Sequence, residues 1–202
     1  MLRTASTCQQ HHIQTAIIGA GVIGLSVARA LSQKGHETLI IEQSTTIGSG
    51  TSSRNPEVIH AGIYYDRNIM PYKSKFCVEG KHLLYEYCKQ RDIPYKQCGK
   101  LLVATDIDQR DNGLLPKLVE YAKRNGVHDL RIVSKEDVAD PYSDVYEPNV
   151  HCTGAVYSPS TGIIDSHSFM QSLLADAEEN GATLALNCHV EGGRCQDGNV
   201  VL

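Results

Sequence analysis

Hydrophobic positions near the start of the chain pass from a strand-like run to a helical spacing. A mainly apolar run at 15–18 is followed by Leu25, Ala28 and Leu31, and a second apolar run ends at Glu42. A short continuous run is typical of a buried strand, and recurrence every three or four positions is typical of a helix. The pattern therefore predicts a strand, a helix and a second strand in this order.

The apolar pattern stops after this second strand. Residues 44–65 are rich in Gly, Ser and Thr, and the next strand that would suit the same sheet, 182–190, comes more than a hundred residues later. A continuous doubly wound sheet would proceed at once to another helix and strand. We therefore expect an insertion between the second and third strands of one sheet.

The inserted region has helical and strand-like patterns of its own. In chain order they are a helix with Phe76, Gly80, Leu83 and Tyr87 on one face, a strand at 99–105, a helix with Leu115, Leu118, Val119 and Ala122 that ends near 125–126, and a strand and turn at 151–165. A long helix follows at 166–182, with Asn-Gly at its C-terminal end. Residues 191–202 are interpreted as the start of a hairpin.

Composition and charge exclude several classes of protein. The chain of 202 residues is 41% hydrophobic and 21% charged, which is an ordinary globular composition. Its formal net charge of −4 comes without the basic surface that binding to a phosphate backbone requires. No apolar run approaches the roughly 20 residues of a membrane-spanning helix. We therefore expect no nucleic acid as a partner and no transmembrane segment.

The cysteines do not indicate a metal site or a disulfide framework. There are seven of them, an odd number, and none forms a C-x-x-C pair, so free thiols are expected. Cys8 with His11 and His12 is the nearest approach to a ligand cluster, but it lies in a polar segment expected to be unstructured. That segment, 1–12, contains an arginine, hydroxyls and no acid, and it is interpreted as a flexible tail or a transit segment.

Three glycines between the first strand and the first helix carry the clearest chemistry. Gly19, Gly21 and Gly24 form a G-x-G-x-x-G pattern, which permits a tight turn and lets a pyrophosphate approach the helix N-terminus. Glu42, about twenty residues further on, is placed to accept hydrogen bonds from ribose hydroxyls and would repel a 2′-phosphate. This arrangement predicts dinucleotide binding, and the alternative is a plain βαβ unit with a glycine-rich turn.

Four segments together resemble the FAD-dependent D-amino-acid-oxidase superfamily, and within it the enzymes that oxidise L-2-hydroxyglutarate. They are "IIGAGVIGLSVARAL" with the later "IIE", "SRNPEVIHAGIYY", "LLYEYCKQRDIPYKQCGKLLVAT" and "SPSTGIIDSHSFMQSL". The resemblance implies FAD as cofactor, oxidation of this or a similar 2-hydroxy dicarboxylate to the 2-oxo acid, and an electron acceptor as partner. It also implies a mitochondrial location, with a cytoplasmic one as the alternative. Another amine or hydroxy-acid oxidase of the superfamily and a non-catalytic nucleotide-binding fragment remain open.

The resulting fold prediction is α/β, a Rossmann-like FAD-binding domain with an inserted, incomplete α+β substrate domain. Residues 13–92 are expected to form the first part of the FAD-binding domain, 93–162 the partial substrate domain, and 163–202 the second part of the FAD-binding domain. The family continues beyond this length, so the 202 residues alone are expected to be inactive and weakly stable. The chain also departs from the family's pattern at Pro56, where a small residue is usual, and proline lacks a backbone N–H.

The resemblance assigns cofactor contacts to the loop after the second strand. Thr51, Ser52, Ser53 and Arg54 would lie along the pyrophosphate and flavin, where hydroxyls, amides and a cation suit an anion. The alternative is a hydrated, flexible Gly/Ser loop. Val190, at the end of the late strand, would meet the adenine through its backbone.

The candidate catalytic residue and two of the three candidate substrate-binding residues lie further along the same loop. His60 is interpreted as the base that removes the substrate hydroxyl proton, since a neutral imidazole suits this task near pH 7; a purely structural histidine is the alternative. Tyr64 or Tyr65 could donate to a substrate carboxylate, but adjacent side chains in an extended segment point opposite ways. Lys75 could supply a charge to the dicarboxylate, and a solvated helix face is its alternative.

Overall fold

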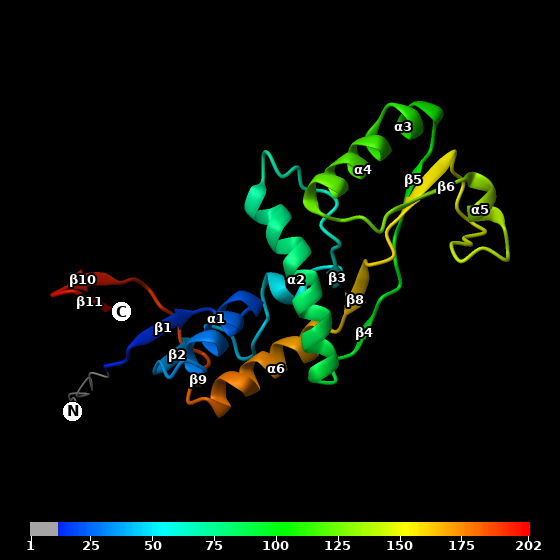
Figure 1. Ribbon diagram of the computed structural model, residues 1–202. Coiled ribbons are helices and arrows are strands. Elements are labelled where there is room, and N and C mark those ends of the chain that lie inside the picture. The colour runs from blue at the N-terminus through cyan, green and yellow to red at the C-terminus, as the bar shows by residue number, and fades with distance from the viewer. Residues whose placement is uncertain (1–11) are drawn as a thin grey trace, which may run out of the picture. The chain divides into compact units, whose positions relative to one another are not determined.

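A computed structural model describes residues 12–202, and the chain divides into two compact units (Figure 1). The discontinuous unit consists of the described residues up to Asn55 together with Ser166–Leu202, and the inserted unit is Pro56–Asp165. The tail and the Cys8–His11 part of the histidine cluster lie outside the described residues. Within the described part, none of the helices has the length and apolar character needed to cross a bilayer.

A parallel sheet of three strands forms the centre of the discontinuous unit. The strands are β1 (Thr15–Ile18), β2 (Thr38–Ile41) and β9 (Thr183–Ala185), in the order β1-β2-β9. Because β9 pairs with β2 although the inserted unit separates them in sequence, the expected interruption of the sheet is confirmed. Parallel neighbours require a crossover connection, which α1 (Val22–Ser32) supplies between β1 and β2.

Two helices pack together beside this sheet. Helices α1 and α6 (Ser166–Glu179) lie side by side in Figure 1 and contact each other. Leu25 and Ala28 of α1 and Met170 and Ala177 of α6 are buried. An ion pair at 2.6 Å also joins the helices, between Arg29 Nε and an oxygen of the buried Asp176. The two sequence segments of the unit thus share one core.

The late strand is shorter than predicted. The apolar pattern suggested 182–190, but β9 ends at Ala185 and Asn187 has a positive φ of 56°. Beyond it, β10 (Arg194–Gln196) and β11 (Asn199–Val201) pair as an antiparallel hairpin, as predicted. Asp197 and Gly198 both have positive φ, as a two-residue type I′ turn requires.

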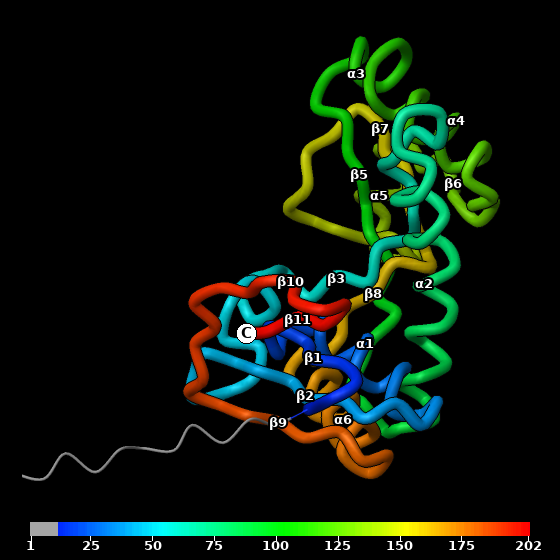
Figure 2. The backbone as a smooth tube through the Cα atoms, turned by 90° about the vertical axis from the view of Figure 1, so that its left-hand side faces the viewer, coloured from blue at the N-terminus to red at the C-terminus, as the bar shows by residue number. Residues whose placement is uncertain are grey.

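The inserted unit contains two small antiparallel sheets. In one of them β5 and β7 run alongside each other (Figure 2). That sheet has the order β5-β7-β6, with β5 at Leu101–Ala104, β7 at Gly154–Tyr157 and β6 at Arg131–Val133. The second has the order β3-β8-β4, with β3 at Val58–Ile59, β8 at Gly162–Ile164 and β4 at Tyr95–Lys96. The helices are α2 (Pro71–Gln90), α3 (Ile107–Asp111), α4 (Leu114–Asn125) and α5 (Lys135–Ala139).

Helix α4 follows its sequence pattern closely. Leu115, Leu118 and Ala122 are buried, and Leu115 packs against Val156 of the sheet. The helix is followed by its C-cap Gly126, which has a left-handed φ of 85°. The N–H of Gly126 donates to carbonyl oxygens of the last turn. The predicted position of this helix and its end are confirmed.

Helix α2 buries its predicted apolar face only in part. Phe76 and Leu83 are 61% and 66% exposed, whereas Ser74, Lys81 and Cys88 are buried. Lys81 lies inward because its ammonium donates to Ser160 Oγ at 2.8 Å. The predicted helix is confirmed, and of its expected apolar face Gly80 and Tyr87 are half-buried whereas Phe76 and Leu83 are exposed.

The boundaries between units differ in position from the predicted domain boundaries. The compact units meet at 55/56 and 165/166, whereas the sequence suggested 92/93 and 162/163, so helix α2 belongs to the inserted unit. The assignment of these parts to a cofactor-binding and a substrate domain stays a prediction. Helices α3 and α5 begin at the side-chain caps Asp106 and Ser134, and the hydrophobic pattern did not reveal either helix.

Candidate functional site

The turn between β1 and α1 forms a cradle in the discontinuous unit. Helix α1 begins after Gly21, which has no side chain to occupy the helix N-terminus, and its first turn contains no acidic residue. Backbone N–H groups and the helix dipole favour an anion at such a position. The cradle can therefore hold the pyrophosphate of a dinucleotide.

Each glycine of the fingerprint meets a separate steric requirement. Gly19 has a positive φ of 98°, in the left-handed region that favours glycine. A Cβ atom on Gly24 would lie 2.0 Å from the carbonyl oxygen of Gly19, and one on Gly21 would lie 3.0 Å from Ser52 Oγ. The close approach of helix and strand therefore depends on Gly24, and the close approach of the Ser52 hydroxyl to the start of the helix depends on Gly21.

Glu42 is bound to the cradle by its own carboxylate. One carboxylate oxygen accepts the N–H of Ala20 at 2.8 Å and the other accepts the N–H of Ser44 at 2.8 Å, and the residue is 8% exposed. The hydrogen bond from Ala20 is the main cause that lowers the pKa of Glu42; burial opposes it and the bonds from Ser44 add to it. Glu42 is therefore ionised at neutral pH and ties β2 to the glycine turn. A role for Glu42 in accepting ribose hydroxyls stays a prediction.

The loop at 51–54 reaches the cradle through one residue. Ser52 Oγ accepts the N–H of Val22, in the first turn of α1, at 3.0 Å. Thr51, Ser53 and Arg54 belong to or follow the short 3₁₀ helix Thr51–Ser53, and their side chains are exposed. The structure thus places Ser52 in the cradle, and the cofactor contacts of the other three stay predictions.

Val190 lies outside the strand that was expected to position it. It follows a segment that runs beside the end of β2, where Cys188 N–H donates to the carbonyl of Glu42 at 3.0 Å and His189 Nδ1 lies 3.1 Å from Gln43 Oε1. This irregular segment, and not a strand, brings the chain back towards Glu42. A contact between Val190 and adenine stays a prediction.

Two candidate residues, His60 and Tyr64, lie together with Lys100 in the inserted unit. The rings of His60 and Tyr64 meet edge to face with centroids 6.1 Å apart, and Lys100 Nζ lies 5.0 Å from the centroid of the Tyr64 ring. His60 is exposed, but partial desolvation by its neighbours lowers its pKa, and the positive charge of Lys100 lowers it further. The imidazole is therefore neutral near pH 7 and able to accept a proton. We call these three residues the His60 cluster.

The backbone of the loop that carries His60 and Tyr64 is held rigidly. Asn125 Nδ2 donates to the carbonyls of Gly62 and Tyr65, both at 2.8 Å. Gly62 has a φ of 87°, and a Cβ there would lie 2.6 Å from a methyl group of Val78. Such constraints suit a site whose side chains must keep fixed positions.

The other two predicted substrate-binding residues have different surroundings. Tyr65 lies 5.6 Å from the ammonium of Lys73, measured to the ring centroid. Lys75 is exposed on α2 and forms a pair with Glu79 at 3.9 Å. The cation beside His60 is Lys100, which the sequence reasoning did not select. Its place directly after a glycine, in the "CGKL" segment, was the available signal.

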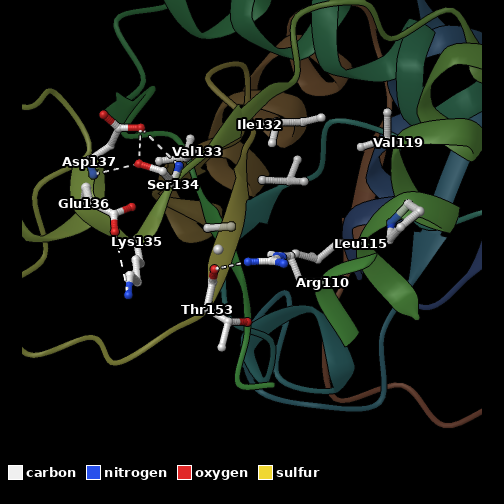
Figure 3. Close-up of a pocket in the computed structure, with 14 residues that line it drawn as sticks. Arg110, Leu115, Val119, Ile132, Val133, Ser134, Lys135, Glu136, Asp137 and Thr153 are labelled. Atoms are coloured by element: carbon white, nitrogen blue, oxygen red, sulfur yellow. Dashed lines mark hydrogen bonds and ion pairs between the residues drawn. The ribbon is translucent and has the colours of Figure 1, made fainter. Parts of the chain in front are cut away.

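The inserted unit also contains a hollow of about 690 Å³ on its β5-β7-β6 sheet (Figure 3). Its apolar lining includes Leu115, Val119, Ile132 and Val156. The polar groups around it pair with one another, Ser134 with Asp137, Lys135 with Glu136, and Arg110 with the carbonyl of Thr153. The predicted site residues do not line this hollow.

Comparisons with known proteins agree with the cradle. The family model described as FAD dependent oxidoreductase (DAO) matches residues 14–202. The chain is 39% identical over 214 residues to the mitochondrial L-2-hydroxyglutarate dehydrogenase of Arabidopsis thaliana, covering 96% of this chain and 42% of that protein. It is 37% identical over 177 residues to a glycerol 3-phosphate dehydrogenase of Caloramator mitchellensis, covering 87% and 35%. The chain thus spans less than half the length of these curated relatives.

The fold is also found in a solved flavoprotein. The chain is similar to L-α-glycerophosphate oxidase from Mycoplasma pneumoniae with FAD bound, with a TM-score of 0.81 and 24% identity, covering 93% of this chain and 48% of that one. At this identity the likeness concerns the fold alone. With the family match it confirms the predicted α/β class and the Rossmann-like FAD-binding domain.

Proposed function

Because the chain belongs to the family of FAD dependent oxidoreductases, we propose that it forms part of an enzyme that oxidises L-2-hydroxyglutarate to 2-oxoglutarate and reduces FAD. The observation that carries this proposal is the 39% identity to a dehydrogenase of this substrate over nearly the whole chain. A glycine cradle suited to a dinucleotide and a neutral histidine in a rigid loop support it.

The cradle residues are proposed to hold the ADP part of FAD. The first turn of α1 would bind the pyrophosphate, Gly21 would keep a side chain away from the helix N-terminus, and Glu42 would accept ribose hydroxyls. The exposed hydroxyls and cation at 51–54 contact the anionic groups further along the cofactor, and the backbone near Val190 contacts the adenine. When bound there, FAD would supply the acceptor for the hydride that leaves the substrate carbon.

His60 is proposed to take the proton of the substrate hydroxyl on its unprotonated ring nitrogen. Partial desolvation and the charge of Lys100 keep this nitrogen free of a proton near neutral pH. General base catalysis of this kind contributes about 10²- to 10⁴-fold to a rate. Tyr64, whose ring meets the His60 ring edge to face, would help to orient the substrate.

The decisive experiment is anaerobic reduction of the FAD-loaded protein by L-2-hydroxyglutarate. The flavin absorbance should bleach with this substrate, and denaturation should release FAD unless it is covalently held. A protein that retains a nicotinamide and no flavin, or that stays yellow with every 2-hydroxy acid, would contradict the proposal.

A second candidate substrate is glycerol 3-phosphate, another secondary alcohol with an anionic group. It is favoured by the 37% identity to a glycerol 3-phosphate dehydrogenase. Side-by-side bleaching rates with the two compounds, and with an amino acid for the amine oxidases of the same family, separate these alternatives.

The location and the electron acceptor are also proposed from the relatives. The name of the Arabidopsis protein places it in mitochondria, and the same location is proposed here, with a cytoplasmic one as the alternative. Reduced flavin must pass its electrons to an acceptor. Oxygen-free assays with artificial dyes would measure this electron transfer as a separate half-reaction.

A further inference from the structure

Lys100 stands out among the lysines of the inserted unit because it lies next to the candidate base. Its ammonium is 5.0 Å from the centroid of the Tyr64 ring, and its charge acts on His60. Among residues 12–202, no carboxylate forms an ion pair with Lys100, whereas Lys75 and Lys135 pair with Glu79 and Glu136. The charge of Lys100 is therefore not neutralised by a carboxylate of the described residues and can attract an anion.

The backbone holds Lys100 in a defined position. The N–H of Lys100 donates to the carbonyl of Ser158 at 3.1 Å, and the N–H of Ser158 donates back at 2.8 Å. The preceding residue, Gly99, donates to the carbonyl of Thr161 at 2.9 Å. These bonds connect the backbone at Lys100 to a turn whose residues Ser158 and Thr161 are buried.

Gly99 sets the direction in which the chain enters Lys100. It has a positive φ of 73°, and a Cβ at this position would lie 2.2 Å from the hydroxyl oxygen of Tyr157. Any other residue would therefore have to displace the Tyr157 side chain and adopt a strained backbone.

We propose that Lys100 binds the far carboxylate of a 2-hydroxy dicarboxylate, the one at the opposite end of the carbon chain from the hydroxyl. Lys100 would thereby select dicarboxylates over monocarboxylates. The proposal rests on the proposed function and deepens it. The Tyr64 ring contacts both His60 and Lys100, so a substrate with its hydroxyl at His60 has to extend past this ring to place an anion on Lys100. Of the two carboxylates, the far one is separated from the hydroxyl by more bonds and so has the longer reach.

Binding of an anion to Lys100 should also change His60. Lys100 disfavours the protonated imidazole by its charge, and an anion on Lys100 cancels that effect. Glutarate is a suitable probe because it has both carboxylates and no hydroxyl, so it cannot be oxidised. In the wild-type protein, glutarate should raise the pKa of His60.

The first test measures binding without turnover. Isotope-labelled histidine is titrated by NMR with and without glutarate, and the His60 resonance is identified by its absence in His60→Gln. In Lys100→Met the pKa of His60 should be higher than in the wild type and should no longer respond to glutarate, whereas Lys100→Arg and the control Lys75→Met should respond as the wild type does. An equal response to glutarate in Lys100→Met would overturn the proposal.

The second test measures selectivity with the FAD-loaded protein. The two substrates are L-2-hydroxyglutarate and L-2-hydroxypentanoate, which has a methyl group in place of the far carboxylate. Lys100→Met should raise KM about tenfold or more for the first and little for the second, as expected for the loss of a charged hydrogen bond. Equal losses on both compounds, or none, would contradict the proposal. If the wild type oxidises neither compound, the proposed function fails, and the glutarate titration still decides whether Lys100 binds the anion.

Discussion

Replacing Glu42 by glutamine separates its contribution to the fold from its contribution to cofactor binding. The carboxylate of Glu42, a residue that is 8% exposed, accepts two backbone N–H groups, those of Ala20 and Ser44, both at 2.8 Å. A glutamine side chain has one oxygen, so one N–H faces an amide NH₂ group and loses its acceptor. Hydrogen bonds to a charged group contribute about 1.5–3 kcal/mol each, and a neutral one about 0.5–1.5. Glu42→Gln should therefore lower the free energy of unfolding by about 2–4 kcal/mol at pH 7.

Urea unfolding of the FAD-free protein, followed by circular dichroism, measures this effect. Glu37→Gln is the matched control, because Glu37 is exposed and nearby in sequence, and it should stay within about 0.5 kcal/mol of the wild type. The difference between wild type and Glu42→Gln should also depend on pH. The folded pKa of Glu42 is lowered, so its stabilisation is fully present above its ordinary value of 4.5 and is lost as the pH falls through the lower folded value.

Two results would refute this reasoning. Equal stability of Glu42→Gln and wild type at pH 7 would show that the two backbone bonds contribute nothing. A stability difference that persists unchanged at low pH would show that the charge is not its cause. Weaker FAD binding with unchanged stability would instead assign Glu42 to the ribose alone.

Three further predictions follow from local contacts. Gly24→Ala should cost about 1–3 kcal/mol of stability and reduce FAD retention, since its Cβ would lie 2.0 Å from the Gly19 carbonyl oxygen. The control Gly80→Ala, in open space on a helix, should stabilise the protein by about 0.5–1 kcal/mol. Thermal unfolding and flavin content measure both variants. His60→Gln should stay yellow yet reduce its flavin about 10²-fold more slowly in stopped-flow assays, and an unimpaired rate would reject the catalytic assignment. Because burial lowers the pKa of Lys81, the wild type should gain stability relative to Lys81→Met as the pH rises through the folded pKa towards 10.5, and a pH-independent difference in urea unfolding would contradict this.

Sequence reasoning succeeded where the relevant interactions are local. The fingerprint glycines are predictable because a left-handed φ at Gly19 and close helix packing at Gly24 are properties of a few neighbouring residues. The end of α4 at Gly126 follows from the same preference of glycine for positive φ. The interruption of the sheet was also predictable, since a polar loop stands where a helix should begin.

Sequence reasoning failed where distant segments decide. The apolar residues Phe76 and Leu83 of α2 are exposed, whereas the buried Lys81 of the same helix donates to a turn that lies about eighty residues away in sequence. The short helices α3 and α5 were missed because side-chain caps, and not periodic apolar residues, define where they begin.

The site shows the same division between sequence and tertiary structure. The sequence by itself determined that a dinucleotide cradle exists and that His60 is a candidate base, because glycine spacing and residue chemistry are written in consecutive positions. Only the tertiary structure decided that Glu42 binds two backbone amides and that Lys100, forty residues after His60, is the cation beside it. The physical reason is that charge and hydrogen bonding act through space over a few ångströms, and folding chooses which residues come within that distance.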